Sequence, residues 1–225
     1  MIKAVIFDFD GLIYDTETNE YNVLNEIFQE HGSELPLSVW GKVIGTQAGF
    51  NALTYLEEQI GKKVDHEKLT KIRRDRFNER MKNEGALPGV EEYLSAAKKA
   101  GLKIGLASSS TYDWVSNHLK NLCLLDYFEC IRTSDDVEKV KPDPALFLEA
   151  AKCLGVSPEE CVVFEDSANG ALAAKRAGMY CVVIPNQVTK DLDFCEVDDR
   201  LVSMASIELN QLLARIERGK TNQGE

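Results

Sequence analysis

Between residues 89 and 184, short apolar runs alternate with helix-like segments. The runs cover residues 102–107 (LKIGLA), 161–164 (CVVF) and 180–184 (YCVVI), and each is almost continuously apolar. Strands that are buried on both faces have this composition, because helices cover both sides of a parallel sheet. The alternation therefore predicts an α/β fold built on a parallel sheet.

The helix-like segments between these runs have clear ends. Residues 90–100 stop at Gly101 and residues 168–177 stop at Gly178. Glycine readily takes the left-handed conformation that follows the C-terminus of a helix. The N-terminal run 3–7 has the composition of a further buried strand. We therefore expect a Rossmann-like parallel sheet core.

Residues 16–87 break this pattern. They contain no convincing strand and four helix-like stretches, in the clearest of which Tyr21, Leu24 and Ile27 repeat on one helical face. A Lys- and Arg-rich stretch at 65–83 is expected to be solvated surface. We expect an α/β core of residues 1–15 and 88–225, with residues 16–87 inserted as an α-helical cap domain. Since ligands in such sheets bind beyond the carboxyl ends of the strands, the insert could close over a bound ligand.

Two acidic pairs follow predicted strands. Asp8 and Asp10, in IFDFDG, come after the first strand, and Glu165 and Asp166 follow CVVF. An Asp-x-Asp-Gly run alone is common in surface turns, so the prediction depends on the two pairs together. At one edge of the sheet the pairs would repel strongly unless a divalent cation lay between them, and oxygen ligands suit Mg²⁺. These residues are therefore the predicted metal site.

Hydroxyl groups and one lysine follow other predicted elements. The sequence LASSS places Ser108, Ser109 and Ser110 after the strand 102–107, where hydroxyl and N–H groups can donate hydrogen bonds to phosphate oxygens. Lys141, in VKPDP, offers a positive charge in a loop that its prolines stiffen. Serine-rich turns and solvated lysines are common, so each signal alone is weak. Together with the acidic pairs they indicate a phosphate-binding site.

The composition limits the partners of the chain. Its 225 residues include 37 acidic and 26 basic side chains, for a formal net charge of -11, which argues against nucleic acid or an anionic membrane as a partner. No apolar run approaches the roughly 20 residues of a membrane span, and no secretory signal is apparent. The six cysteines form no CxxC pair and lie mostly in apolar segments. We therefore expect a cytoplasmic monomer with buried, reduced thiols.

The order and spacing of these motifs resemble the haloacid dehalogenase superfamily of phosphotransferases. The resemblance covers DFDG, the serine after the second core strand, the Lys-Pro pair and the Glu-Asp pair. The segments KPDPALFLEAAKCLG and FEDSANGALAAKRAGM are similar in detail to the subgroup with a helical cap, which contains β-phosphoglucomutase and many sugar-phosphate phosphatases.

This resemblance implies a role for each motif. Asp8 would attack phosphorus and form an aspartyl-phosphate, and Asp10 would be the acid and base. Asp8, the backbone carbonyl of Asp10 and Asp166, with or without Glu165, would hold Mg²⁺. The serine and lysine motifs would bind the phosphoryl oxygens. The implied function is Mg²⁺-dependent hydrolysis of small phosphate monoesters, with sugar phosphates favoured.

Other functions remain open. A phosphomutase would use the same core, but the resemblance implies a Lys-Arg pair around its cap loop and a histidine at the start of its first cap helix. The comparable loop here is VIGTQAGF, with Lys42 nearby and no arginine, and Glu20 or Tyr21 occupies the region of the histidine. A 2-haloacid dehalogenase would not be expected to carry Asp10 together with the 165–166 pair. A phospho-receiver signalling domain would be much shorter and would lack the inserted helices.

The substrate is predicted only as a small phosphorylated metabolite. Lys42, Thr46 and Gln47 are the predicted substrate contacts in the cap, and Trp40 and Asn51 could also line the entrance. Nucleotides, flavin mononucleotide and glycolate phosphate remain alternatives to sugar phosphates.

Overall fold

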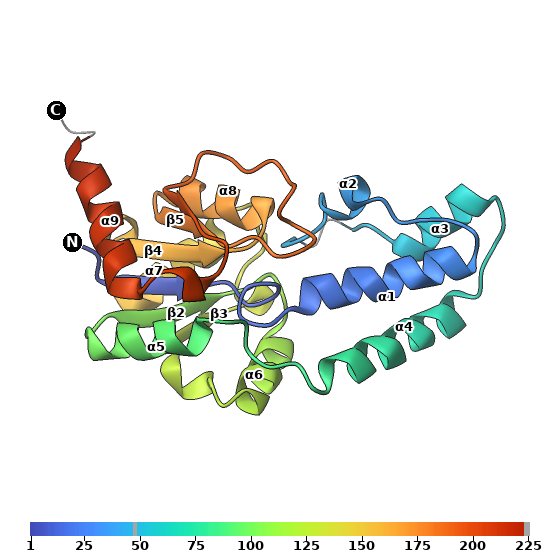
Figure 1. The fold of residues 1–225 in the computed structure, drawn as a ribbon, viewed down its shortest axis with the longest axis horizontal. Helices are drawn as coiled ribbons and strands as arrows, with labels where there is room; N and C mark the ends of the chain where they lie inside the picture. Colours follow the sequence, from blue (N-terminus) through green and yellow to red (C-terminus); the bar gives the residue numbers. More distant parts are fainter. Residues whose placement is uncertain (47–48, 223–225) are drawn as a thin grey trace.

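The computed structural model describes residues 1–46 and 49–222, and for residues 220–222 only the backbone. Figure 1 shows a sheet covered by helices and, beside it, a group of helices formed by the chain between β1 and α5. We refer to this group, α1 to α4, as the helical insert.

The sheet has six parallel strands in the order β3-β2-β1-β4-β5-β6. Their bounds are β1 Ala4–Phe7, β2 Lys103–Ala107, β3 Cys130–Arg132, β4 Cys161–Glu165, β5 Tyr180–Val183 and β6 Asp199–Arg200. Phe7 of the central β1 is in register with Leu106 of β2 and Phe164 of β4. The carboxyl ends of β1, β2 and β4 therefore lie side by side at one edge. The predicted α/β fold with a Rossmann-like parallel sheet is confirmed.

Helices cover both faces of this sheet because alternate strand residues point to opposite sides. Val5 and Phe7 of β1 pack with α5 (Val90–Lys99), α6 (Tyr112–Asn121) and α9 (Leu209–Asn222). Ala4 and Ile6 pack with α7 (Ala145–Leu154) and α8 (Ala168–Arg176) on the other face. The central strand is thus fully buried, which explains its continuously apolar sequence.

All four strands expected from the sequence are present, but β3 and β6 were not predicted. These two strands form the edges of the sheet and have only three and two residues, CIR and DR. Short, charged edge strands resist pairing with other chains. The same property leaves no apolar run for sequence analysis to detect.

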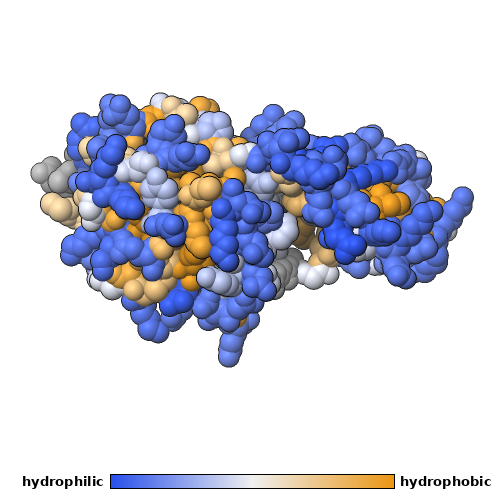
Figure 2. Space-filling view, turned by 90° about the horizontal axis from the view of Figure 1, so that it is seen from below, coloured by the Kyte–Doolittle hydropathy of each residue, from blue (hydrophilic) through white to orange (hydrophobic). Residues whose placement is uncertain are grey.

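The helical insert consists of α1 (Thr16–Glu30), α2 (Leu37–Trp40), α3 (Ala52–Ile60) and α4 (His66–Met81). Asp15 caps α1 by accepting a hydrogen bond from the Thr18 N–H at 3.2 Å. Ion pairs join α1 to α4, including Arg76 with Glu30 at 2.7 Å. The side of the insert formed by α4 is mainly hydrophilic (Figure 2), as its Lys- and Arg-rich sequence predicted.

The prediction that all six cysteines are reduced thiols is wrong. Cys130 of β3 and Cys153 of α7 form a disulfide, with their Cα atoms 6.2 Å apart. The two residues are 23 positions apart in sequence, and nothing in that spacing marks them as partners. The packing of α7 against β3 brings them together. Cys161 and Cys181 are buried thiols, as expected.

A membrane-spanning helix would need to be longer and more apolar than any helix found in residues 1–46 and 49–222.

Candidate active site

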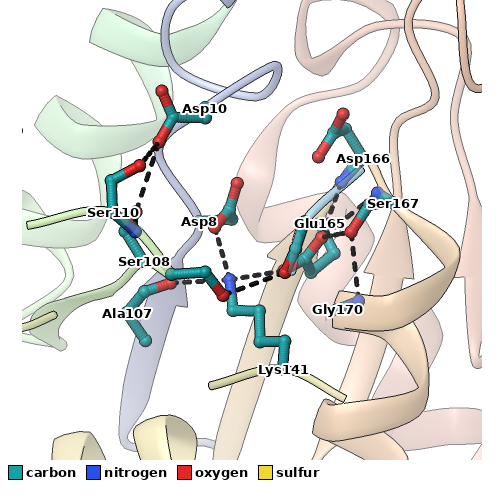
Figure 3. Close-up of polar contacts among 12 residues, drawn as sticks. Asp8, Asp10, Ala107, Ser108, Ser110, Lys141, Glu165, Asp166, Ser167 and Gly170 are labelled. Carbon is teal, nitrogen blue, oxygen red and sulfur yellow. Dashed lines mark hydrogen bonds and ion pairs between the residues drawn. The ribbon is translucent and has the colours of Figure 1, made fainter. Parts of the chain in front are cut away.

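Lys141 connects the ends of the three central strands (Figure 3). Its ammonium group donates hydrogen bonds to the Ala107 carbonyl at the end of β2 at 2.7 Å and to Glu165 Oε1 of β4 at 2.7 Å. It also donates to Asp8 Oδ1, directly after β1. The lysine is completely buried. Burial alone would lower the pKa of Lys141, but the carboxylates of Asp8 and Glu165 outweigh it and raise the pKa, so the lysine stays charged.

Three buried carboxylates gather at this point. One oxygen each from Asp8, Glu165 and Asp166 lies within 4.8 Å of the others. Burial raises the pKa of Asp8 and of Asp166, and neighbouring carboxylates raise both further, although Lys141 opposes the shift. The positive charge of one lysine therefore balances the negative charges of three carboxylates only in part. This excess of negative charge and the all-oxygen ligand set fit a divalent cation such as Mg²⁺.

Groups of the protein itself donate several hydrogen bonds to the Glu165 carboxylate. Its Oε2 accepts hydrogen bonds from the N–H groups of Asp166 and Ser167, both at 3.1 Å, and from the Ser167 hydroxyl at 3.0 Å. Its Oε1 accepts from Lys141. Glu165 therefore has less capacity left for a further ligand, and Asp8 and Asp166 are the residues of the cluster that could hold a metal ion.

Asn186 lies beside Asp166 and was not predicted from the sequence. Its side-chain amide donates to Asp166 Oδ2 at 2.7 Å and to the Gly11 carbonyl at 3.3 Å. Asn186 follows β5, so the signal that could have found it is a polar residue just beyond the carboxyl end of a strand. Gly11 also has a steric role, because a Cβ atom there would lie 2.3 Å from Asp166 Oδ2.

The carboxylate of Asp10 lies on the opposite side of Asp8 from Asp166 (Figure 3). Its Oδ1 accepts from the Thr16 hydroxyl and from Trp114 Nε1, both at 2.9 Å. Its Oδ2 accepts from the hydroxyls of Ser110 at 2.6 Å and Ser108 at 3.3 Å. The side chain is therefore held by both the insert and the core. Any metal contact by Asp10 would have to come from its backbone carbonyl.

Ser108 and Ser109 stand at the end of β2, as predicted. Ser108 is buried, its N–H donates to the Arg132 carbonyl at 2.9 Å, and its hydroxyl accepts from the Ser110 N–H at 3.0 Å. The Ser109 hydroxyl donates to the Gly45 carbonyl of the insert at 2.9 Å. Phosphate binding by Ser108, Ser109 and Lys141 remains a prediction.

Two adjoining cavities open over these residues. The inner cavity, about 350 Å³, is lined by Asp8, Ser108 and Ser109 of the core and by Gly45 of the insert. The outer cavity, about 490 Å³, lies against the insert and is lined by acidic, aromatic and basic side chains. Both cavities share Asp10, Glu17, Thr46, Ser110 and Trp114. They therefore form one continuous space that starts at Asp8.

Only some of the predicted substrate contacts line the cavities. Thr46 lines both cavities, whereas the exposed Lys42 lines neither. Lys42 contributes its carbonyl, which accepts a hydrogen bond from Asn169 at 3.3 Å. Gln47 lies outside the described residues. Of the other candidates, Trp40 lines the outer cavity and Asn51 caps α3.

Glu17 and Trp114 line the cavities but were not predicted to do so. Glu17 lies in the first turn of α1. That turn faces Asp10, and burial raises the pKa of the Glu17 carboxyl, with Asp10 and Asp8 raising it further. Trp114 sits in the first turn of α6, directly after the serine loop, and this position in the chain is the signal for it.

Comparison with known proteins agrees with this geometry. Residues 5–184 match the model of the haloacid dehalogenase-like hydrolases, so the chain belongs to that family. It is 68% identical over 213 residues to the Bacillus subtilis (strain 168) protein named "Putative phosphatase YhcW", covering 95% of this chain and 97% of the relative. It is 32% identical over 186 residues to the "Phosphorylated carbohydrates phosphatase" of Thermotoga maritima, covering 79% and 82%.

Solved structures show the same fold. The crystal structure of β-phosphoglucomutase from Clostridium difficile matches with a TM-score of 0.75 and 25% identity, covering 98% of this chain and 100% of that one. The family resemblance drawn from the motifs is therefore confirmed.

Proposed function

We propose that this protein is a Mg²⁺-dependent phosphatase that hydrolyses small phosphate monoesters, with sugar phosphates as the substrate class. The observation that carries the proposal is the position of Asp8. Its carboxylate is held by Lys141, lies within the three-carboxylate cluster and lines the inner cavity. The names of the Bacillus subtilis and Thermotoga maritima relatives support hydrolysis of phosphorylated compounds.

In the proposed reaction, Asp8 attacks phosphorus. Lys141 binds Oδ1, and the second oxygen of Asp8 points away from the lysine (Figure 3). That oxygen would form a bond to phosphorus as the bond to the leaving alkoxide breaks, giving an aspartyl-phosphate. Asp8 and Asp166, with the backbone carbonyl of Asp10, would hold Mg²⁺, which offsets repulsion between the Asp8 carboxylate and the phosphate.

Asp10 would move the protons. In its protonated form it would donate a proton to the leaving oxygen, and as a carboxylate it would then take a proton from the water that attacks the aspartyl-phosphate. Its four donors come from both sides of the cavity. They fix the carboxylate toward the shared cavity space, where the leaving group must lie.

The helical insert would act as the cap that excludes water. Its loop 41–46 contacts the core through the Gly45 carbonyl and Ser109, and through the Ile44 carbonyl and Asn169 at 2.8 Å. Gly45 has φ +75°, and a Cβ atom there would lie 2.3 Å from Ser167 Oγ. Only glycine allows this approach without displacement, so we propose that the insert closes over substrate at this point.

A phosphomutase is the second candidate, favoured by the structural similarity to β-phosphoglucomutase. Both reactions would begin with phosphoryl transfer to Asp8. They differ in the acceptor in the second step, which is water in the phosphatase and a sugar hydroxyl in the mutase.

Phosphate release from a panel of metabolite phosphates, with Mg²⁺ and with EDTA, tests the proposal. We expect release only with Mg²⁺, and loss of release in Asp8→Asn. Asp126→Asn, an exposed acid outside the cavity, is the control and should retain activity. Full activity of Asp8→Asn would exclude the nucleophile assignment. Isomerised glucose 1-phosphate without net phosphate release, in the presence of a bisphosphate primer, would favour the mutase.

A further inference from the structure

The lining of the outer cavity includes an ion pair. Arg73 of α4 contacts Glu20 of α1, with 3.3 Å between Arg73 Nε and Glu20 Oε1. Both residues line the cavity. Glu20 is 23% exposed and Arg73 45% exposed, so the pair lies at the solvent-accessible edge of the cavity.

The charged side chains that line the two cavities are mainly acidic. Arg73 is the only basic side chain on their described lining, whereas Asp8, Asp10, Glu17 and Glu20 are acidic. Residues 47 and 48, which the structure does not describe, are glutamine and alanine and carry no charge. A second anionic group on a substrate would therefore be repelled by carboxylates. Arg73, the one side chain of the described lining that could attract it, already contacts Glu20.

An arginine can bind phosphate or carboxylate through two parallel hydrogen bonds, but one that pairs with a carboxylate loses part of that capacity. We infer that Glu20 determines specificity by neutralising Arg73, so that the enzyme accepts monophosphates with an uncharged polyhydroxy leaving group and discriminates against substrates with a second phosphate or a carboxylate. This inference rests on the proposed phosphatase function.

The rest of the outer cavity suits such a leaving group. Aromatic side chains of Trp40, Phe50, Phe77 and Trp114 line it. Rings of this kind pack against the apolar C–H faces of a sugar, and the Glu20 carboxylate can accept hydrogen bonds from hydroxyl groups.

Competitive inhibition by two compounds that differ in one phosphate tests the inference. The reaction is hydrolysis of p-nitrophenyl phosphate with Mg²⁺, and the inhibitors are glucose 6-phosphate and glucose 1,6-bisphosphate. The wild type should be inhibited more strongly by the monophosphate. In Glu20→Gln, the inhibition constant of the bisphosphate should fall about fivefold or more relative to that of the monophosphate, because a negative charge leaves the wall and Arg73 becomes available.

Two further variants identify the cause. In Glu20→Gln combined with Arg73→Gln the gain should disappear, since the arginine that would bind the second phosphate is absent. Glu26→Gln is the matched control: Glu26 pairs with Arg80 across the same two helices but does not line either described cavity. It should leave the ratio of the two inhibition constants unchanged, which excludes a general effect of loosening α1 from α4.

Other results separate the two proposals. The specificity inference alone would be overturned if the wild type hydrolyses p-nitrophenyl phosphate but binds the bisphosphate more tightly than the monophosphate, and if Arg73→Gln abolishes this preference. An unchanged ratio in Glu20→Gln would do the same. Failure of the wild type to hydrolyse any phosphate ester with Mg²⁺ would overturn the proposed function.

Discussion

Replacing Lys141 with methionine should destabilise the protein strongly. The ammonium group is completely buried and compensates the carboxylates of Asp8 and Glu165. Methionine fills similar space but leaves these carboxylates without a cation. Removing one partner of a buried ion pair typically costs about 3–5 kcal/mol of the free energy of unfolding. For a chain of this size, that corresponds to a fall in Tm on the order of 10 °C.

The effect should depend on pH in a defined direction. Burial already raises the pKa of Asp8 above its ordinary value, and loss of Lys141 would raise it further. A raised pKa in the folded state destabilises the fold when the group is forced to ionise, so the penalty is greatest at high pH. Since the pKa of Asp8 is about 8 with Lys141 present and higher without it, Asp8 of the variant becomes protonated as the pH falls from 10 to 7, and the difference from the wild type should shrink over that range.

Thermal and urea unfolding in EDTA at pH 7 and pH 10 measures both quantities. Lys139→Met is the control, because Lys139 is exposed, lies two residues away and should change stability by less than about 0.5 kcal/mol. A loss below about 1 kcal/mol in Lys141→Met would refute the reasoning. So would a loss that grows as the pH falls.

Three further predictions concern the disulfide, the insert contact and the thiols. Cys153→Ser should lower the free energy of unfolding by about 3 kcal/mol, because it removes a disulfide that closes a loop between residues 23 positions apart. Thermal unfolding measures this loss, and an unchanged Tm would show that the disulfide contributes nothing to stability. Gly45→Ala should reduce kcat/KM about tenfold or more through the left-handed backbone and the clash with Ser167 Oγ; steady-state kinetics on the best substrate checks it, and wild-type values would argue against closure at this loop. At pH 8, iodoacetamide should label the exposed Cys123 but not Cys161, since burial raises the pKa of the Cys161 thiol to about 12. Peptide mass spectrometry of the labelled native protein checks this, and labelling of Cys161 as fast as Cys123 would contradict it.

Much of the site could be predicted because parallel strands have a shared polarity. Once the apolar runs were identified as strands of one parallel sheet, their carboxyl ends had to meet at one edge. Asp8, Glu165 and Lys141 follow or approach those ends and do lie together. Local sequence therefore contained both the strand and the chemistry that follows it.

Contacts between distant segments could not be predicted in the same way. Asp10 receives donors from Thr16, Ser110 and Trp114, up to 104 residues away. A periodic sequence shows which face of an element is buried, but not which other element covers that face. Trp114 was missed for this reason.

The sequence by itself determined the class of fold, the helical insert after the first strand and the order of the chemical motifs. Each of these features depends on local apolar periodicity or on residues next to the end of a strand. Only the tertiary structure decided the Cys130–Cys153 pairing, the position of Asn186 on Asp166 and the contact of Glu20 with Arg73. Each of these joins residues at least 20 positions apart. Such distances are closed by packing of whole elements, and that packing depends on the complete core rather than on any one segment.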